Sequence, residues 1–535
     1  MAVANPIKSN DKSGEKGPSI TDAGLPQRRN AELLMLIFAT VIVIAAQVAA
    51  DFGLSGKLDP QIAWYALGYI GVWGVAHIVV RFTAPYADPI LLPSVALLNG
   101  LGLVMIRRLD FSAAERARTA GNPIPHAAGT SQILWMVVGL VLFAAVLIIV
   151  RDHRVLGRFT FTLGAVGLVL LILPAILPSS LAPVINGAKI WLRFGGFSLQ
   201  PGEFAKVALL ISFAGYLVAK RDVLSLASRK VVGLEFPRMR DLGPIILVWI
   251  ISMLVLMFER DLGSSLLFFG IFVALLYIAT EKVSWVVIGL LMFSGGATVS
   301  YFMFGHVQAR VTAWLNPFGS GDIGYQLRQA LFGFGTGGIF GTGWGLGHPD
   351  SVPLPESDFI ISSLGEELGL VGLVAILVLY LVIIERGFRT SLLVRDSFGT
   401  LLAAGLGFSI GLQVFVIVGG VTGLIPLTGL TTPFLSAGGS SLIANFALIG
   451  LLVRMSDASR RPVVRAAPRG QISDQTMQMA RINPESVGSV AHKHSAKRRI
   501  MRLRTGQTGE HLSLAEQLNN PQFEQSPPDQ DGDRR

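Results

Sequence analysis

The sequence predicts an all-α, polytopic integral membrane protein with about twelve transmembrane helices. Hydrophobic residues make up 51% of the 535-residue chain and charged residues only 15%, whereas soluble domains carry about 25% charged residues. The mean hydropathy is +0.58. Apolar segments long enough to cross a bilayer, about 17–25 residues, recur from Ala31 to Met455. So little charge cannot cover the surface of a water-soluble protein of this length.

The predicted spans share an apolar composition and a helical length, and the third, sixth and seventh are the shortest. They lie near residues 31–50, 61–83, 90–106, 131–150, 160–178, 204–219, 242–258, 262–280, 284–304, 360–385, 398–420 and 438–455.

Two polar segments flank the spans. Residues 1–30 are rich in Lys, Ser, Gly and Pro, and we expect a disordered tail, because the charged region is too long for a signal peptide. Residues 456–535 are basic through Arg504 and then rich in Gln, Pro and Asp, so we expect a second disordered tail. A docking segment for cytoplasmic partners is the alternative for this second tail.

Loop charges predict the orientation, because Lys and Arg accumulate on the cytoplasmic side of membrane proteins. With twelve spans both termini share one side. The N-terminal tail, the loops 151–159 and 220–241 and the loop after Glu385 are all basic and fall on that side. Both termini are therefore expected in the cytoplasm, with the loop 107–130, which carries four arginines, as the exception. The net charge of +10 is then explained by basic residues on the cytoplasmic side of the membrane, and no nucleic-acid partner is expected.

Several kinds of chemistry are excluded or disfavoured by residues that the sequence lacks. There is no cysteine, which excludes disulfides, a zinc finger and a thiol nucleophile. The eight histidines are scattered without an HExxH pattern, and no Walker loop is present. No organic cofactor and no ATP-driven transport by this chain alone are expected.

Three segments on the non-cytoplasmic side, 179–203, 305–359 and 421–437, are candidates for function. The middle segment is far longer than an ordinary connection. Chemistry is therefore expected on the outer face of the membrane.

The first candidate group lies before and within the sixth span and comprises Asn186, Lys189, Arg193, Gln200, Glu203 and Lys206. Glu203 and Lys206 are three residues apart, so they share a helix face and can pair. One interpretation is an ion pair that only ties helices together. The other is a cationic rim, formed by Lys189, Arg193 and Lys206, that holds an anionic headgroup such as a pyrophosphate.

The next two groups precede the tenth span. Glu259, Arg260 and Asp261 are expected to form a charged turn at the membrane surface. The stretch from His306 to His348 contains Arg310, Gln326 and a formal GxGxxG pattern over residues 333–338. Because a dinucleotide fingerprint needs a preceding strand in a βαβ unit, we interpret these glycines as close-packing or flexible positions.

Residues 352–369 carry the candidate catalytic acid. Asp358 stands at the mouth of a long span, so it is either an N-cap or a general base at the edge of a cavity. Glu366 follows eight residues later and points roughly along the same face. Residues 422–446, which include Ser436 and Ser440, form a hydroxyl-rich irregular loop that must line a cavity or pack against protein.

Five motifs occur in an order that resembles the RodA/FtsW (SEDS) family: QPGEFAK, DLGSS, GYQLRQALFGFGTGG, PESDFIISSLGEELG and GLTTPFLSAGGSS. The likeness covers roughly residues 90–455. The ten spans of the family correspond to the third through twelfth spans here, and residues 31–89 look like an added pair of helices. This addition, with the long tails, is most similar to RodA-type members of the actinobacterial branch.

The resemblance implies a peptidoglycan glycosyltransferase that polymerises lipid II for cell elongation on the outer face of the cytoplasmic membrane. An FtsW-type division enzyme is an alternative within the family. Asp358 occupies the place of the family's essential outer-loop carboxylate, although ESD replaces the acid, spacer and HTD of many members, so no neighbouring His is available. The family also implies a class B penicillin-binding transpeptidase as partner.

The expected leaving group is a polyprenyl pyrophosphate, whose charge is met by Lys189, Arg193 and Lys206, with a divalent cation (Mg²⁺ or Mn²⁺) as a further expectation. The residues expected to bind substrate are Lys189, Arg193, Gln200, Glu203, Lys206, Asp261, Arg310, Gln326, Glu366, Ser436 and Ser440.

Two functions from other classes compete with this hypothesis. A lipid II flippase needs polar residues through the whole depth of the bilayer, whereas here they cluster toward one side. A scaffold that only recruits the transpeptidase leaves the buried charges unexplained.

Overall fold

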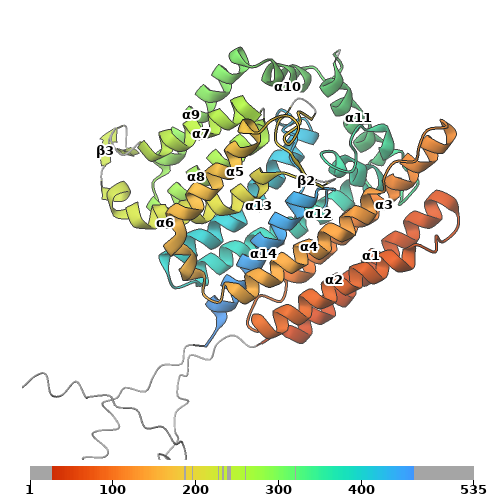
Figure 1. Ribbon diagram of the computed structural model, residues 1–535, viewed down its shortest axis with the longest axis horizontal. Coiled ribbons are helices and arrows are strands. Elements are labelled where there is room, and N and C mark those ends of the chain that lie inside the picture. Colours follow the sequence, from red (N-terminus) through yellow and green to blue (C-terminus); the bar gives the residue numbers. More distant parts are fainter. Residues whose placement is uncertain are drawn as a thin grey trace, which may run out of the picture. The chain divides into compact units, whose positions relative to one another are not determined.

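The computed structural model describes residues 27–462, except 186–187, 195–196, 227, 232–233, 238–242, 260 and 320. Each of the twelve predicted spans is a helix in this part of the chain (Figure 1). These helices are α1 (Arg29–Ser55), α2 (Ile62–Thr83), α3 (Leu91–Thr119), α4 (Ala128–Ile149), α5 (Thr160–Ile176), α6 (Pro201–Leu226), α7 (Gly243–Glu259), α8 (Leu262–Thr280), α9 (Val283–Met303), α12 (Ile360–Leu393), α13 (Ser397–Val421) and α14 (Gly439–Arg460). Eleven are long and apolar enough to cross a membrane, with α5 taken together with the preceding residues from His153, and α7, with 17 residues, is not among them. The protein is a multi-pass membrane protein.

The connections contain shorter elements. Two antiparallel hairpins pair β1 (Leu192–Phe194) with β2 (Phe197–Leu199) and β3 (Ser228–Val231) with β4 (Leu234–Pro237). Two 3₁₀ helices, η1 (His153–Phe159) and η3 (Pro349–Ser351), complete the set together with the helices α10 (Gly305–Leu315) and α11 (Asp322–Gly337). The expectation that 305–359 is one long loop was therefore wrong for its first half. Helix α11 buries Leu327, Ala330, Gly333 and Gly337 at helical spacing, which identifies its packed face.

The third predicted span, 90–106, was also too short, because α3 continues to Thr119. The apolar run ends at Ile106, but the next two residues are arginines that are buried and paired. Arg107 contacts Asp51 and Asp59, and Arg108 donates a 2.6 Å hydrogen bond to Glu367. A prediction from hydropathy alone ends this helix at the first charged residue. In the structure the helix continues, because acidic partners neutralise the two arginines inside the bundle.

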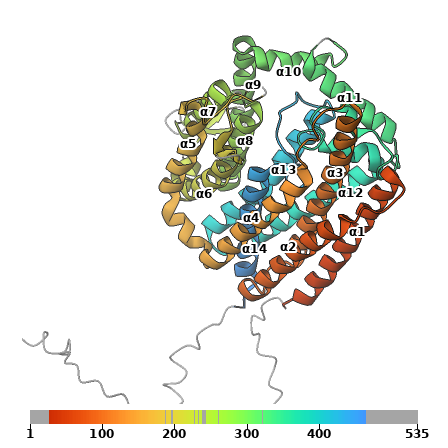
Figure 2. The ribbon, with the colours of Figure 1, turned by 45° about the vertical axis from the view of Figure 1, so that its right-hand side comes forward.

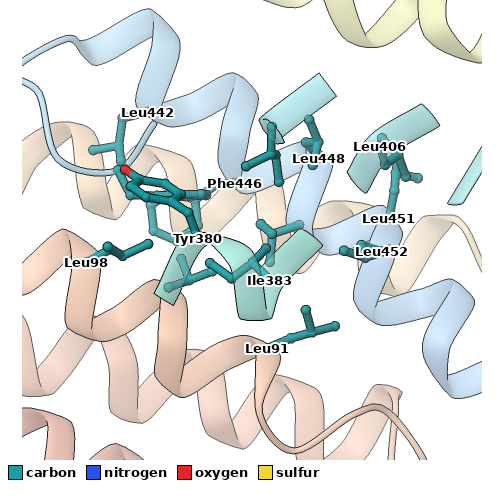
Figure 3. Packing of buried hydrophobic residues seen from close by; sticks show 14 of the residues in the cluster. Leu91, Leu98, Tyr380, Ile383, Leu406, Leu442, Phe446, Leu448, Leu451 and Leu452 are labelled. Atoms are coloured by element: carbon teal, nitrogen blue, oxygen red, sulfur yellow. The ribbon is translucent and has the colours of Figure 1, made fainter. Parts of the chain in front are cut away.

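The core forms where α3, α4, α12, α13 and α14 pack together, and α3 and α14 are buried over most of their length. Figure 3 shows Leu91 and Leu98 of α3 beside Tyr380 and Ile383 of α12 and Phe446 of α14. The ring of Phe446 contacts three further aromatic rings, those of Trp73, Phe143 and Phe434. The additional helix α2 thereby joins the same core.

Both ends of the helical bundle lie on one side. Arg29, at the start of α1, donates to the carbonyl of Ala87, and Arg460, at the end of α14, pairs with Asp88. The backbone N–H of Tyr86 donates to Asp457 at 2.9 Å. The helices α10 and α11 lie at the opposite end (Figures 1 and 2). The shared side of the two ends is what an even number of spans requires.

Gly102 shows how closely α3 approaches the segment 428–438. A Cβ atom at this position would lie 2.3 Å from the carbonyl oxygen of Leu435 and 2.7 Å from its Cα. Gly102→Ala should therefore displace this segment and destabilise the protein by about 1–3 kcal/mol, as overpacked cores do. The measurement is thermal unfolding of the purified protein in detergent.

Gly74→Ala in α2 is the matched control, because no heavy atom lies within 4 Å of the new Cβ. This change should leave the melting temperature unchanged or raise it slightly, since Ala favours helix over Gly by about 1 kcal/mol. Equal melting temperatures for the two variants would contradict the close approach at Gly102.

Candidate active site

Asp358 lies directly before α12, but it does not cap this helix. Helix α12 begins at Ile360, its N-cap residue is Phe359, and no side chain caps it. The N-cap alternative for Asp358 is therefore wrong. The side chain of Asp358 is partly exposed, and its carboxylate does not bind the backbone N–H groups at the start of α12. The carboxylate can therefore contact a ligand.

Arg310 of α10 lies next to Asp358, and Gly429 marks the point where the two meet. A Cβ atom at Gly429 would lie 3.4 Å from Nη2 of Arg310 and 3.7 Å from Oδ2 of Asp358. Gly429 has φ +76°, a conformation that favours glycine. A Cβ atom here would be in ordinary van der Waals contact with both charged groups, so Gly429 lies where the two side chains come together, and its positive φ is what disfavours other residues.

The guanidinium of Arg310 is held by backbone. Its Nη1 donates a 2.9 Å hydrogen bond to the carbonyl of Leu427. Burial lowers the pKa of Arg310, and the charges of Asp261 and Asp358 raise it. Among the described side chains no carboxylate contacts Arg310 at ion-pair distance. Its positive charge is therefore available to an anionic ligand.

Burial raises the pKa of the Asp358 carboxyl to about 6. The charge of Arg310 opposes this shift, whereas Asp261 and Glu356 add to it. Desolvation dominates because protein surrounds most of the carboxyl group. A carboxylate with this pKa is largely ionised at neutral pH and still basic enough to accept a proton during a reaction.

A chain of buried polar contacts links the helices beneath this site. Glu203 and Lys206 pair at 2.9 Å, which confirms the predicted contact. Lys206 also donates to Oε1 of Gln413 on α13 at 2.9 Å, and the amide of Gln413 donates to the carbonyl of Thr431 at 2.9 Å. The chain thus ties α6 and α13 to the segment that carries Gly429.

The three cations predicted to form one rim have separate surroundings. Lys206 is buried in the chain just described. Lys189 donates to the carbonyls of Ala175 and Leu177 at 3.2 and 2.6 Å, where α5 ends. Arg193 is exposed on β1. Asn186, from the same predicted group, lies outside the described residues.

The two predicted serines hold backbone in place. Ser436 donates a 2.6 Å hydrogen bond to the carbonyl of Ser357 and accepts one from the N–H of Thr432 at 2.8 Å. The N–H of Ala437 donates to the carbonyl of Glu356 at 2.8 Å. These contacts fix the two residues that immediately precede Asp358. Ser440 accepts the N–H of Gln200 at 2.9 Å, which joins the start of α14 to the start of α6.

The remaining predicted residues have separate roles or surroundings. Asp261 is the N-cap residue of α8, its side chain is buried rather than at the surface, and it accepts hydrogen bonds from the N–H and hydroxyl of Ser264 at 3.0 and 2.6 Å. The side chains of Glu259 and Arg260 lie outside the described part. Glu366 accepts the N–H of His348 at 2.6 Å and so braces the segment before Asp358. Gln326 is partly exposed on α11.

Of the three glycines in the GxGxxG pattern only Gly333 packs closely, because no heavy atom lies within 4 Å of a Cβ atom at Gly335 or Gly338, while Gly337 between them makes the closest approach. A Cβ at Gly337 would lie 2.2 Å from the carbonyl oxygen of Gly365, and one at Gly333 would lie 3.2 Å from Oε2 of Glu366. Helix α11 therefore lies close against the start of α12. No nucleotide fingerprint is formed, because these glycines lie on a helix and at its end.

An apolar cavity of about 310 Å³ adjoins the charged site. It lies among α7, α8, α9, α10, α13 and the segment 425–428, and its lining includes Leu266, Phe269, Phe293, Phe415 and Pro426. Lining residues also come from directly beside the charged groups: Leu262 follows Asp261, Val307 and Val311 flank Arg310, and Thr428 precedes Gly429. A ligand with an anionic head and an apolar tail fits this arrangement.

Sequence reasoning missed Gln413 and Gly429. Gln413 is a buried amide within an apolar span, and a polar residue at such a position is a signal of function or structural necessity. Gly429 lies in the recognised segment GLTTPF, but its role depends on two side chains that are distant in sequence.

A family model described as "Cell cycle protein" (FTSW_RODA_SPOVE) matches residues 90–461. The chain belongs to this family. "Peptidoglycan glycosyltransferase RodA" from Mycobacterium tuberculosis (strain ATCC 25618 / H37Rv) is 50% identical over 457 residues, covering 85% of this chain and 96% of that protein. "Probable peptidoglycan glycosyltransferase FtsW" from Geobacter sp. (strain M18) is 37% identical over 281 residues, covering 51% of this chain and 73% of that protein. The family predicted from five motifs is thereby confirmed.

One solved structure has the same fold as this chain. It is described as "Structural coordination of polymerization and crosslinking by a peptidoglycan synthase complex". Its chain aligns with a TM-score of 0.55 and 25% identity, over 70% of this chain and 99% of that one. The part of this chain outside the family match includes α1 and α2.

The pair Glu203–Lys206 generates a testable prediction. Lys206→Met leaves Glu203 buried without its cation, which should cost about 3–5 kcal/mol of stability. The double variant Glu203→Leu/Lys206→Met removes both charges and should recover most of that loss. The measurement is the free energy of unfolding of the purified protein in detergent. A single variant as stable as the wild type would contradict the buried pair.

Proposed function

We propose that this chain is a peptidoglycan glycosyltransferase that polymerises lipid II into glycan strands. One observation carries the proposal: the carboxylate of Asp358 and the guanidinium of Arg310 meet at Gly429, at the edge of an apolar cavity. The mycobacterial relative named as this enzyme supports the activity. This combination suits a lipid-linked sugar pyrophosphate, which has a charged centre and an apolar tail.

Asp358 acts as the general base. Its carboxylate takes the proton of the 4-hydroxyl of the acceptor GlcNAc, and the oxygen attacks C1 of the donor sugar. The bond from C1 to the pyrophosphate oxygen breaks, and polyprenyl pyrophosphate leaves with the electron pair. Attack from the face opposite the leaving group inverts an α-linked donor into a β-linked product. One base and a good leaving group suffice for this displacement.

Arg310 stabilises the leaving group. Charge develops on the pyrophosphate as the bond breaks, and a fixed cation in a partly desolvated site stabilises that charge. Arg310 is held in place through Leu427 and presents a planar fork suited to phosphate oxygens. The adjoining cavity takes the first part of the polyprenyl tail. Lys189 and Arg193 stay candidates for contacts further along the substrate, whereas Lys206 acts through the buried chain.

The role of a divalent cation, Mg²⁺ or Mn²⁺, stays a prediction. Among the described residues no group of three or more His, Asp or Glu side chains is arranged to hold a metal ion. The protein groups do not form a cage, so every step above relies on Asp358 and Arg310 alone.

The site faces the outer side of the cytoplasmic membrane in this proposal, with both termini in the cytoplasm. The ends of α1 and α14 lie together, and the site lies where α14 begins, at the other end of that helix. The connection after α4 carries Arg151, Arg154 and Arg158 and contacts Asp396 before α13 through His153 at 2.9 Å. These basic connections support the orientation by the positive-inside rule.

The partner in this proposal is a class B penicillin-binding transpeptidase. The solved neighbour is described as a peptidoglycan synthase complex that coordinates polymerisation and crosslinking. A role in elongation is favoured over division, because identity with the relative named RodA is 50% and with the relative named FtsW 37%.

Replacing the base tests the proposal. Asp358→Asn keeps the shape of the side chain but removes its basicity, so glycan synthesis from lipid II should fall by about 100-fold or more. Glu356→Gln is the control, because it removes a neighbouring carboxylate and should retain most of the activity. The assay is polymerisation by purified protein in liposomes, with and without the transpeptidase partner. Full activity of Asp358→Asn would overturn the assignment.

The raised pKa predicts an acid limb in the pH profile. Asp358 works as the ionised form, which predominates above its pKa of about 6 and is lost as the pH falls through that value. At pH 5 the rate should therefore be about one tenth of its plateau. The measurement is kcat/KM for lipid II from pH 5 to pH 8. A flat profile across this range would contradict a base with this pKa.

A further inference from the structure

Helix α1 of the additional pair α1–α2 contacts the segment that leads to Asp358. At Gly53, near the end of α1, a Cβ atom would lie 2.1 Å from the carbonyl oxygen of Trp344. In return, a Cβ at Gly345 would lie 2.6 Å from the carbonyl oxygen of Ala50 and 3.0 Å from the N–H nitrogen of Leu54. Two glycines therefore allow the backbone of α1 to press directly on the backbone of the segment 341–350.

A second contact runs through two consecutive arginines of α3. Arg107 points to the added helices: it contacts Asp51, bonds Asp59 at 2.9 Å and lies over the ring of Tyr65 at 5.1 Å. All three partners belong to α1, α2 or their connection. Arg107 is 2% exposed, so the added helices supply the charges that permit its burial.

Arg108 points to the other side and grips the segment 341–350. It donates to Glu367 at 2.6 Å and to the carbonyl of Gly347 at 2.5 Å, and it lies 3.6 Å from Asp350. Glu367 in turn accepts the N–H of Gly345 at 3.0 Å. The segment is thus clamped between α1 on one side and α3 with the start of α12 on the other.

We propose that the helix pair α1–α2 is a positioning element of the active site, which fixes the segment 341–350 and thereby the place of Asp358. This inference rests on the proposed function, in which Asp358 is the base. Neither helix of the pair lines the apolar cavity beside Asp358, whose lining residues all lie at or after Trp249. A base displaced by about 1 Å loses rate rather than substrate affinity.

Gly53→Ala is the sharpest test, because it adds one methyl group at the contact and at the same time favours the helical state of α1. In the full chain in liposomes, kcat for lipid II should fall about tenfold or more while KM changes less than about twofold. Hydrogen exchange of the amides in 341–358 should become faster. Gly71→Ala in α2, where no atom lies within 4 Å of the new Cβ, should match the wild type in all three measurements.

Three outcomes overturn the inference. The first is that Gly53→Ala retains the kcat of the wild type, and the second is that it lowers kcat without changing the hydrogen exchange of the amides in 341–358. The third outcome is a rise in KM that is as large as the fall in kcat. Exchange is measured without substrate, so unchanged exchange overturns the inference even if the wild type makes no glycan. A wild type that makes no glycan contradicts the proposed function separately.

A second variant covers the case in which Gly53→Ala does not fold. Asp59→Asn weakens the hold on Arg107 but leaves Asp51 in place, and the side chain of Asp59 is 23% exposed. It should lower kcat and speed exchange in the same direction, by less than Gly53→Ala. Lys57→Gln, an exposed change in the same connection, is its control, and equal kcat and exchange in the two variants would overturn the inference.

Discussion

A charged side chain that is buried inside this helical bundle needs an oppositely charged or polar partner at contact distance. The packing of the helices around the site depends on this requirement. A buried ion without a partner costs several kcal/mol. Arg107 and Arg108 of α3 therefore bind two separate layers, the added helices on one side and the start of α12 on the other. Lys206 does the same between α6 and α13. Buried charged residues such as Arg107 and Arg108 interrupt the apolar pattern by which a span is recognised in the sequence, and in the structure their contacts connect neighbouring helices.

The segment 428–438 is irregular backbone deep in the protein, so its polar groups must be satisfied by side chains. Tyr380 donates to the carbonyl of Pro433, Asn99 to that of Phe434 at 3.1 Å, and Gln132 to that of Ser436 at 3.2 Å. These donors come from three different helices, α12, α3 and α4. These hydrogen bonds hold the segment against the surrounding helices, and the segment in turn contacts the residues before Asp358.

The site separates its tasks in space. Asp358 lies on a segment supported by backbone hydrogen bonds, Arg310 comes from a short helix outside the spans, and the apolar cavity is formed by the spans themselves. Burial tunes the carboxylate, while the cation is held by one carbonyl and keeps its charge unpaired among the described side chains. Proton transfer, charge stabilisation and lipid binding thus use different elements that meet at Gly429.

The sequence by itself predicted the helical membrane fold, the twelve helices and the family, because hydropathy and contiguous motifs are local properties, and it named Asp358 as a candidate base. It also predicted the pair Glu203–Lys206, since three residues on a helix place two side chains together. Only the tertiary structure decided that Asp358 is not an N-cap, that Arg310 is the cation beside it, that Lys189 binds carbonyl groups at the end of α5, and that Arg193 is exposed on β1. Residues 310, 358 and 429 come together through three separate segments, and a contact of that kind leaves no periodicity in the sequence.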